Sequence, residues 1–278
     1  MKITTLIEDL TGDNKKLKCE HGLSFLIEVD KEKILFDTGE TGKFIWNAEN
    51  LNIDLKRVNK VILSHAHHDH CNGVRKILKH YDIAPKFYVG SHFFKNGNKY
   101  RYSEEEMAHK YVGADFDEEF LRNRRIEIEY VNENITKISE DVYIFANFDR
   151  SIDFEKNNHS LRVKRGNEYE IDKFEDEIVV GLDTKKGLLL LLGCSHPGII
   201  NIIETIAKRT SKRIYGIVGG THLIEADEDR IKKTMEYLKK VDTKILGFSH
   251  CTGVTAEKMF KEEFMQFYVN RTGSVIEI

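Results

Sequence analysis

The stretch VILSHAHHDHCNG, residues 61–73, concentrates side chains that bind metal ions. Four histidines and one aspartate occupy positions 65–70, directly after a short apolar run. Imidazole nitrogen and carboxylate oxygen are ligands of zinc and of other first-row divalent ions. Alternate side chains of an extended segment point to the same side, so His65 and His67 can bind one ion. Asp69 and His70 follow at the turn into a helix and can hold a second ion, so the spacing His-x-His-x-Asp-His predicts a metal site.

A metal site of this composition can carry out catalysis. An ion with an open coordination position lowers the pKa of a bound water from about 15.7 to about 7, and it polarises a carbonyl or phosphoryl oxygen. We predict that Asp69 both binds metal and orients the attacking water. The side chain of His68 is expected to point away from its two neighbours. It then either supports the ligands or faces the substrate, or it serves packing alone.

Three of the four cysteines lie within two residues of a histidine, namely Cys71, Cys194 and Cys251. No CxxC spacing or dense disulfide pattern is present. Free cysteine is usually a small buried residue, so packing on tight loops is one interpretation. The other is a thiolate near or on a metal, with Cys194 and Cys251 supporting the ligands. His222 follows Gly219-Gly220 and is either a substrate contact and proton donor or a loop histidine with a packing role.

Alternating strands and helices must position these residues. Before and around the histidine cluster, apolar patterns predict strands over 2–7, 23–29, 33–36, 58–63 and 85–89, and helices over 41–51 and 74–80. After residue 177 the patterns predict a hairpin of 178–182 and 188–192, helices over 199–208, 227–240 and 255–264, and strands over 213–218, 244–248 and 274–278. Asp227 is expected to cap its helix, whose Ile231, Met235 and Leu238 form one apolar face. Strands that alternate with helices in two halves predict an α/β sandwich.

Residues from about 91 to 170 differ from the rest, because they are rich in charged and aromatic side chains and lack long apolar strands. We interpret them as an insertion in a single domain of residues 1–278. The insertion either covers the site or is a solvated excursion without a role. A short internal sequence repeat supports two related halves. VILSH, ending at His65, matches ILGFSH, ending at His250, and HCNGV matches HCTGV. The repeat places histidines at the ends of equivalent strands.

Composition and charge exclude several classes of protein. A hydrophobic content of 40% with 32% charged residues is typical of a globular chain. The net charge of −3 disfavours nucleic acid and anionic membranes as partners. The segment MKITTLIEDL lacks the pattern of a signal peptide, and the longest apolar run, Leu188–Leu192, is too short to span a bilayer. We therefore expect a cytoplasmic protein with a small-molecule partner, whose oligomeric state the sequence does not indicate.

The histidine motif resembles the signature of the metallo-β-lactamase fold superfamily. ILFDTG, residues 34–39, resembles its first motif, whose aspartate, here Asp37, lies behind the metal site and holds the loop by hydrogen bonds. Four further segments resemble one subfamily, the archaeal dihydropterin–ribofuranosylaminobenzene-phosphate synthases and their bacterial relatives: EHGLS (20–24), GCSHPGIIN (193–201), GGTHL (219–223) and SHCTG (249–253). The resemblance covers essentially the whole chain and implies the superfamily's αββα sandwich.

The resemblance also implies the metal ligands. They come from both ends of the chain: His65, His67 and His196 for the first ion, and Asp69, His70 and His250 for the second. Many members carry an aspartate that bridges the two ions, where this chain has Cys194-Ser195-His196. We therefore expect one or two ions, with Zn2+ as the first choice and Mn2+ or Fe2+ as alternatives.

These observations predict a metal-dependent hydrolase that acts on a small phosphorylated or otherwise anionic substrate. Pro197 fits the first position of a helix, and the free N–H groups of that helix would favour an anion at the site. Two alternatives stay open: a transferase that joins a pterin diphosphate to an aminobenzene phosphate and releases pyrophosphate, and a non-catalytic metal or ligand sensor. An exported β-lactamase is disfavoured by the missing export signal. A redox diiron role is disfavoured by His67, where diiron members favour a carboxylate.

Overall fold

The computed structural model describes residues 1–278, and the chain divides into two compact units. Unit 1 comprises Met1–Asn132, Asn157–Asp176 and Arg271–Ile278, and unit 2 comprises Glu133–Lys156 and Glu177–Asn270. Each unit contains a seven-stranded sheet with helices packed against it, so both are mixed α/β structures, as the alternating patterns predict. None of the helices combines the length and the apolar character needed to cross a membrane.

The main sheet of unit 1 has the strand order β18-β1-β2-β3-β4-β5-β8. Its strands are β1 (Lys2–Ile7), β2 (Ser24–Val29), β3 (Glu32–Phe36), β4 (Lys60–Leu63), β5 (Lys86–Gly90), β8 (Ile128–Val131) and β18 (Val275–Glu277). The four strands from β3 to β8 run parallel, so their carboxyl ends meet at one edge. Asp37 and Ser64 directly follow β3 and β4 at this edge.

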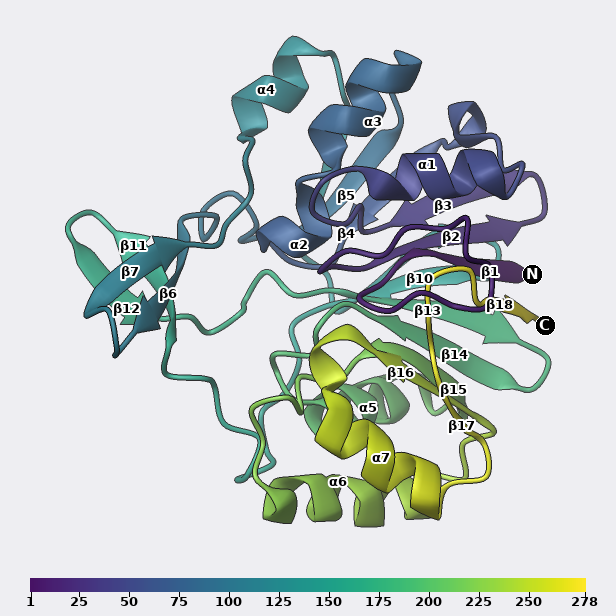
Figure 1. Ribbon diagram of the computed structural model, residues 1–278, viewed down its shortest axis with the longest axis vertical. Coiled ribbons are helices and arrows are strands. Elements are labelled where there is room, and N and C mark those ends of the chain that lie inside the picture. The colour runs from purple at the N-terminus through teal and green to yellow at the C-terminus, as the bar shows by residue number, and fades with distance from the viewer. The chain divides into compact units, whose positions relative to one another are not determined.

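Helices cover one face of this sheet (Figure 1). They are α1 (Lys43–Asn50), the 3-10 helix η1 (Leu55–Arg57), the short α2 (His68–Cys71), α3 (Val74–Tyr81) and α4 (Glu118–Asn123). In α3 the apolar positions Val74, Ile77 and Leu78 are buried in the core that the helices form with β1 to β5. This i, i+3, i+4 spacing is one helix face, which explains why the segment after the histidines is a helix.

Residues 91–170 contribute to all three sheets of the molecule. Within unit 1, a separate sheet has the order β12-β11-β6-β7 and lies to one side of the main sheet in Figure 1. It consists of β6 (Lys99–Ser103), β7 (Ala108–Tyr111), β11 (Leu161–Arg165) and β12 (Glu168–Ile171). Strand β8 joins the main sheet of unit 1, while β9 and β10 belong to unit 2. The cover role of this segment remains a prediction.

The sheet of unit 2 has the order β17-β16-β15-β14-β13-β10-β9. Its strands are β9 (Ile135–Ser139), β10 (Val142–Phe145), β13 (Val179–Thr184), β14 (Gly187–Leu192), β15 (Ile214–Gly220), β16 (Ile245–Ser249) and β17 (Phe267–Val269). Strands β13 and β14 form the predicted hairpin, and β14 to β17 run parallel. Every side chain from Leu188 to Leu192 is at most 1% exposed, which explains the unbroken apolar run of β14.

Three helices pack on one face of this second sheet (Figure 1), and the short 3-10 helix η2 (His250–Thr252) directly follows β16. They are α5 (Ile199–Thr210), α6 (Glu228–Lys240) and α7 (Val254–Glu263). The apolar face predicted for α6 is confirmed, because Ile231, Met235 and Leu238 are buried. Asp227 is the predicted N-cap, and its side chain accepts a 2.8 Å hydrogen bond from the Arg230 amide.

Replacement of Asp227 tests this cap. We expect Asp227→Ala to lower the free energy of unfolding by about 1 kcal/mol, because it leaves a helix N–H group without its partner. Asp227→Asn removes the charge but keeps an oxygen acceptor, so it should cost less than half as much. Denaturant unfolding followed by far-ultraviolet circular dichroism measures both values. Equal losses in the two variants would contradict a capping role.

Candidate metal centre

Asp37 organises the histidine loop of unit 1 from behind. The Asp37 carboxylate is completely buried and accepts hydrogen bonds of 2.7 Å from both the backbone N–H and the hydroxyl of Ser64. A third contact of 2.7 Å joins it to Nδ1 of His70. A histidine that donates from Nδ1 to a carboxylate keeps Nε2 as a lone-pair donor, which is the arrangement common behind metal-bound histidines. Asp37 thus holds the loop by hydrogen bonds, while its place behind a bound metal remains a prediction.

His65 and His67 lie close enough to share an ion. Nε2 of His65 is 3.0 Å from Nδ1 of His67, and the ring of His70 lies 4.4 Å from the His65 ring. Two nitrogens bound to one tetrahedral zinc ion lie about 3.3 Å apart, from metal–nitrogen distances of about 2.0–2.1 Å. Burial, followed by the nearby charges of His70 and His67, holds the pKa of His65 well below its ordinary value. The ring is therefore neutral at physiological pH, the form that binds metals.

The Asp69 carboxylate lies between two histidines. Its Oδ2 is 3.5 Å from Nε2 of His70 and 3.4 Å from Nε2 of His21. His21 was not predicted as a site residue, although it belongs to the recognisable motif EHGLS. The next residue, Gly22, has a φ of +133°, and a Cβ there would lie 2.2 Å from the Asp69 carbonyl oxygen. Only glycine permits this close approach, which brings the EHGLS loop onto the metal-binding motif.

His68 is directed differently from the other three histidines of the motif. Nδ1 of His68 lies 3.4 Å from Oε1 of Glu40, and 28% of its side chain is exposed. Its backbone N–H donates a 2.9 Å hydrogen bond to Val112. Its contact with Glu40 is compatible with either a supporting or a substrate-facing role.

A buried lysine supports the histidine loop from the small sheet of unit 1. Nζ of Lys99 contacts Asp172 at 2.6 Å and Asp176 at 2.9 Å, and all three side chains are buried. Burial alone would lower the pKa of Lys99, but the charges of Asp176 and Asp172 outweigh it and raise the pKa. The other carboxylate oxygen of Asp176 accepts a 2.9 Å hydrogen bond from the N–H of Ala66, between His65 and His67.

Phe174 belongs to the same support. The Lys99 ammonium lies 4.5 Å from the centre of the Phe174 ring, and this ring meets the His67 ring edge-on at 5.5 Å. No sequence pattern identified Lys99, Phe174 or Asp176 as site residues. The only local signal was an acidic pair, Asp176-Glu177, immediately before an apolar strand.

In unit 2 the loop after β14 is held by another carboxylate, that of Glu177. Its two oxygens accept hydrogen bonds from the N–H groups of Ser195 at 2.6 Å and His196 at 2.9 Å. Ser195 also donates from its hydroxyl to the Gly220 carbonyl at 2.7 Å, and its φ is +62°. His196, a predicted ligand, is thereby fixed at a buried loop position.

The expectation that helix α5 offers free N–H groups to an anion is wrong. The helix begins at Ile199 with Gly198 as its N-cap, so Pro197 precedes it. The buried carboxylate of Glu155 accepts hydrogen bonds from the N–H groups of Ile200 at 2.9 Å and Asn201 at 2.8 Å. The chain therefore supplies its own anion at this helix N-terminus, from a residue 45 positions away that no local pattern indicated.

His222, His250, Cys194 and Cys251 also belong to unit 2. Cys194 and Cys251 lie with His222 in one cluster, in which the possible ligand atoms are all within 4.8 Å of one another.

Burial opposes ionisation of Cys251, but hydrogen bonds to Cys194 and His222 and the charge of His250 outweigh this effect. They hold the pKa of Cys251 well below its ordinary value. Burial also opposes a charge on His222, but the neighbouring Cys251 sulfur and the Glu225 carboxylate raise the pKa of His222 to about 9. His250 is buried directly after β16.

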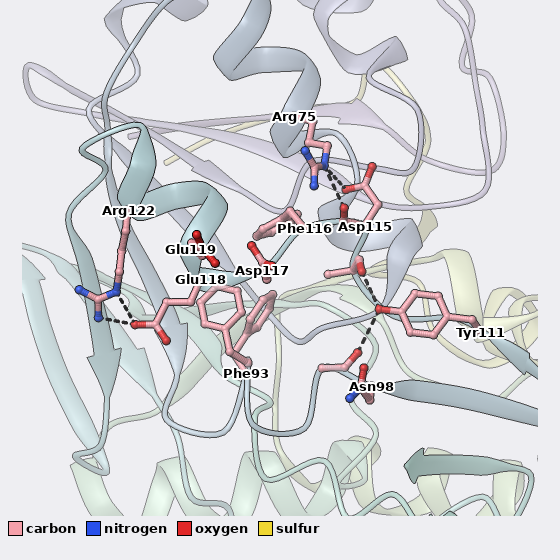
Figure 2. A pocket seen from close by; sticks show the side chains of 13 residues that line it. Arg75, Phe93, Asn98, Tyr111, Asp115, Phe116, Asp117, Glu118, Glu119 and Arg122 are labelled. Carbon is pink, nitrogen blue, oxygen red and sulfur yellow. Dashed lines mark hydrogen bonds and ion pairs between the residues drawn. The ribbon is translucent and has the colours of Figure 1, made fainter. Parts of the chain in front are cut away.

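A recess of about 730 Å³ opens in unit 1 (Figure 2). Aromatic side chains line part of it, and four carboxylates outnumber two guanidinium groups: Phe93, Phe94, Tyr111, Phe116, Asp115, Asp117, Glu118, Glu119, Arg75 and Arg122. Both arginines are already paired, Arg75 with Asp115 and Arg122 with Glu118. The Asp115 N–H donates a 2.8 Å hydrogen bond to Asn72, which immediately follows helix α2. The recess thus adjoins the metal-binding motif and carries net negative charge.

Comparison with known proteins agrees with these motifs. A family model described as the metallo-beta-lactamase superfamily matches residues 17–157. The chain belongs to the metallo-β-lactamase superfamily. Its similarity to the 7,8-dihydropterin-6-methyl-4-(beta-D-ribofuranosyl)-aminobenzene-5'-phosphate synthase of Methanocaldococcus jannaschii amounts to 34% identity, covering 96% of this chain and 92% of that one. A second protein of that organism, MJ0448, is 28% identical over 95% of this chain and 96% of its own length.

A solved structure carries the same metallo-β-lactamase fold over the whole chain. It is described as Tm1679, a metal-dependent hydrolase of the beta-lactamase superfamily, and is 30% identical with a TM-score of 0.86, covering 100% of this chain and 99% of that one. The predicted superfamily and its fold are therefore confirmed. The superfamily is metal-dependent, and the neutral, closely spaced imidazoles of unit 1 fit such an ion.

Lys99 offers a test of the support behind the histidine loop. We expect Lys99→Met to lower the free energy of unfolding by about 3–5 kcal/mol, because two buried carboxylates lose their only lysine partner. Lys110→Met, which removes an exposed i,i+4 pair with Glu106, is the matched control and should cost less than about 1 kcal/mol. Fluorescence of Trp46, the single tryptophan and a residue of unit 1, reports the denaturant midpoint. Equal midpoints for the two variants would rule out this role of Lys99.

Proposed function

We propose that this protein is a metal-dependent hydrolase that acts on a small phosphorylated or otherwise anionic substrate. The observation that carries the proposal is the buried group of His65, His67, Asp69 and His70, held from behind by Asp37. Membership of a metal-dependent superfamily supports it, as does the 30% identity to a protein described as a metal-dependent hydrolase.

We propose that the ligands come from three loops. In unit 1 these are the loop after β4 with its short helix α2, and in unit 2 His196 and His250 would complete the set that the sequence motifs imply. When bound, a divalent ion, with zinc as the first choice, would lower the pKa of a coordinated water and polarise a carbonyl or phosphoryl oxygen. The positive charge of the ion is the feature that favours an anionic substrate, since Glu155 already occupies the N-terminus of α5.

Three side chains of the protein would then have separate roles in the reaction. Asp37 holds Nδ1 of His70 and leaves Nε2 for the ion. Asp69, between His21 and His70, would bind metal and orient the attacking water. His222, whose pKa of about 9 keeps it protonated at neutral pH, would donate a proton to the leaving group.

One observation favours a second candidate, a transferase that joins a pterin diphosphate to an aminobenzene phosphate and releases pyrophosphate. The 34% identity to a dihydropterin-linked synthase extends over nearly the whole chain. The acidic recess of unit 1 is consistent with it, because a pterin ring carries an amino group and a ring N–H that donate hydrogen bonds to carboxylates. An anionic group would be repelled by the same recess, so the phosphorylated end of either substrate belongs at the ion.

Replacement of His67 tests the hydrolase proposal. We expect His67→Ala to lose bound metal and to reduce turnover by more than about a hundredfold, since even residues that only support metal ligands are worth 10–100-fold. His80→Ala removes an exposed histidine paired with Glu49 and is the matched control. Elemental analysis and a panel of phosphodiester, lactone and thioester substrates, with zinc- and manganese-loaded protein, measure the two effects. Full activity in His67→Ala would contradict the proposal, and tight ligand binding without turnover in any metal form would indicate a sensor.

Release of pyrophosphate separates the two enzymes. A transferase should release pyrophosphate only when a pterin diphosphate and an aminobenzene phosphate are present together. A hydrolase should release a product from one substrate and water alone. A coupled pyrophosphate assay with each substrate omitted in turn makes the distinction. Release that does not depend on the second substrate would exclude the transferase.

A further inference from the structure

Three loops of unit 2 place a candidate ligand at the same step beyond their strands. β14 ends at Leu192, β15 at Gly220 and β16 at Ser249. The second residue after each strand is, in turn, Cys194, His222 and Cys251. The three strands are parallel neighbours, with Leu192 paired to Gly219 and Gly220 paired to Ser249, so their carboxyl ends lie level at one edge. Topology therefore brings two thiols and one imidazole to a single point.

The atoms of this cluster are close enough for a metal ion. The sulfurs of Cys194 and Cys251 and a ring nitrogen of His222 all lie within 4.8 Å of one another. Two sulfurs at about 2.3 Å from a tetrahedral zinc ion lie about 3.8 Å apart, so small side-chain movements close the site. Cys194 is 3% exposed and Cys251 is 7% exposed, whereas 15% of the His222 side chain is exposed.

The surroundings of the cluster suit thiolate ligands. The N–H of His222 points at Sγ of Cys251 over 3.2 Å, a contact that stabilises negative charge on sulfur. A Cβ at Gly220 would lie 2.6 Å from that sulfur, so glycine keeps the space that Cys251 fills. Neither ring nitrogen of His222 has a hydrogen-bond partner, although Nε2 lies 3.6 Å from Oε2 of Glu225. A bound ion would satisfy one of these buried nitrogens.

We propose that Cys194, His222 and Cys251 bind a thiophilic transition-metal ion, and that this ion is zinc in the cell. Two thiolates and one imidazole favour zinc over magnesium, calcium or manganese, which prefer oxygen ligands. Three protein ligands leave the fourth position of a tetrahedral ion open, as in catalytic rather than structural zinc sites. Binding displaces the protons that the thiol and imidazole ligands carry in the metal-free chain.

Two of the three ligands of this site would be cysteine sulfurs. The site does not depend on the hydrolase proposal. The ring of His196 lies 4.2 Å from the His222 ring, so the cluster adjoins a residue proposed as a ligand of the hydrolytic centre. His222 would exchange its role as a proton donor for that of a ligand when this site is filled. The two proposals can therefore fail separately, and the test has to distinguish them.

Cobalt substitution makes sulfur ligation visible. We expect the full-length protein loaded with Co2+ to show sulfur-to-cobalt charge-transfer absorption in the near ultraviolet. Cys194→Ser and Cys251→Ser should each weaken this band by about half or more, and the double variant should lose it. Cys19→Ser, which alters a half-buried thiol of unit 1, is the control and should keep it. His67→Ala should also keep the band, because His67 is not one of the three residues of the cluster.

X-ray absorption at the zinc edge of the unmodified protein provides a measurement that needs no variant. Sulfur scattering at about 2.3 Å is expected. Zinc bound by nitrogen and oxygen alone, or a cobalt band that Cys251→Ser leaves unchanged, would overturn the inference and leave the hydrolase proposal standing, because only Cys251 of the two thiols is confined to this cluster. A sulfur signal in a protein that lacks all hydrolytic turnover would support the inference and count against the hydrolase proposal.

Discussion

The buried carboxylate of Asp37 is the constraint on which the histidine loop of unit 1 depends. It follows β3 and has no exposed surface. Three short hydrogen-bonding contacts from Ser64 and His70 stabilise it. A buried carboxylate without such donors would be costly, so the loop after β4 must keep the conformation that supplies them. The same contacts direct the lone pair of His70 away from Asp37. Because the buried Asp37 carboxylate needs these donors, it also fixes the orientation of the His70 ring.

Buried carboxylates accept hydrogen bonds from backbone N–H groups in the ligand-bearing loops of both units. Asp176 holds Ala66 in unit 1, and Glu177 holds Ser195 and His196 in unit 2. The Glu177 contact helps to hold Ser195 at a positive φ, a conformation that costs a non-glycine residue about 1–3 kcal/mol. The φ values are +58° for Asp37, +62° for Ser195, +49° for His222 and +54° for His250. Each of these four residues lies shortly after a strand that has a parallel neighbour, where the candidate ligands also lie.

Local patterns predicted the parts of this structure that depend on local physics. The apolar run of β14, the helix face of α6 and its Asp227 cap follow from side-chain periodicity and capping chemistry, and the histidine motif follows from ligand spacing. The contacts between residues distant in sequence did not follow. Lys99 meets Asp172 and Asp176 more than seventy positions away, and Glu155 caps a helix that begins 44 residues later. Nothing in the neighbourhood of Lys99 or Glu155 distinguishes them from surface charges.

The error at α5 has the same origin. Pro197 and Gly198 correctly indicated that a helix begins nearby, but the sequence does not show which group satisfies its first N–H donors. The segment 91–170 was harder for another reason. Its strands are short and half-exposed, and they are divided among three sheets, so no continuous pattern marks them. Short strands depend on pairing with partners elsewhere in the chain, and sequence periodicity does not reveal those partners.

Anomalous diffraction at the zinc absorption edge, from crystals of the full-length protein grown with zinc, tests the central claim most directly. We expect a strong anomalous peak about 2.0–2.1 Å from ring nitrogens of both His65 and His67. A fully occupied zinc ion elsewhere in the protein, with no peak at bonding distance from these two histidines, would contradict it.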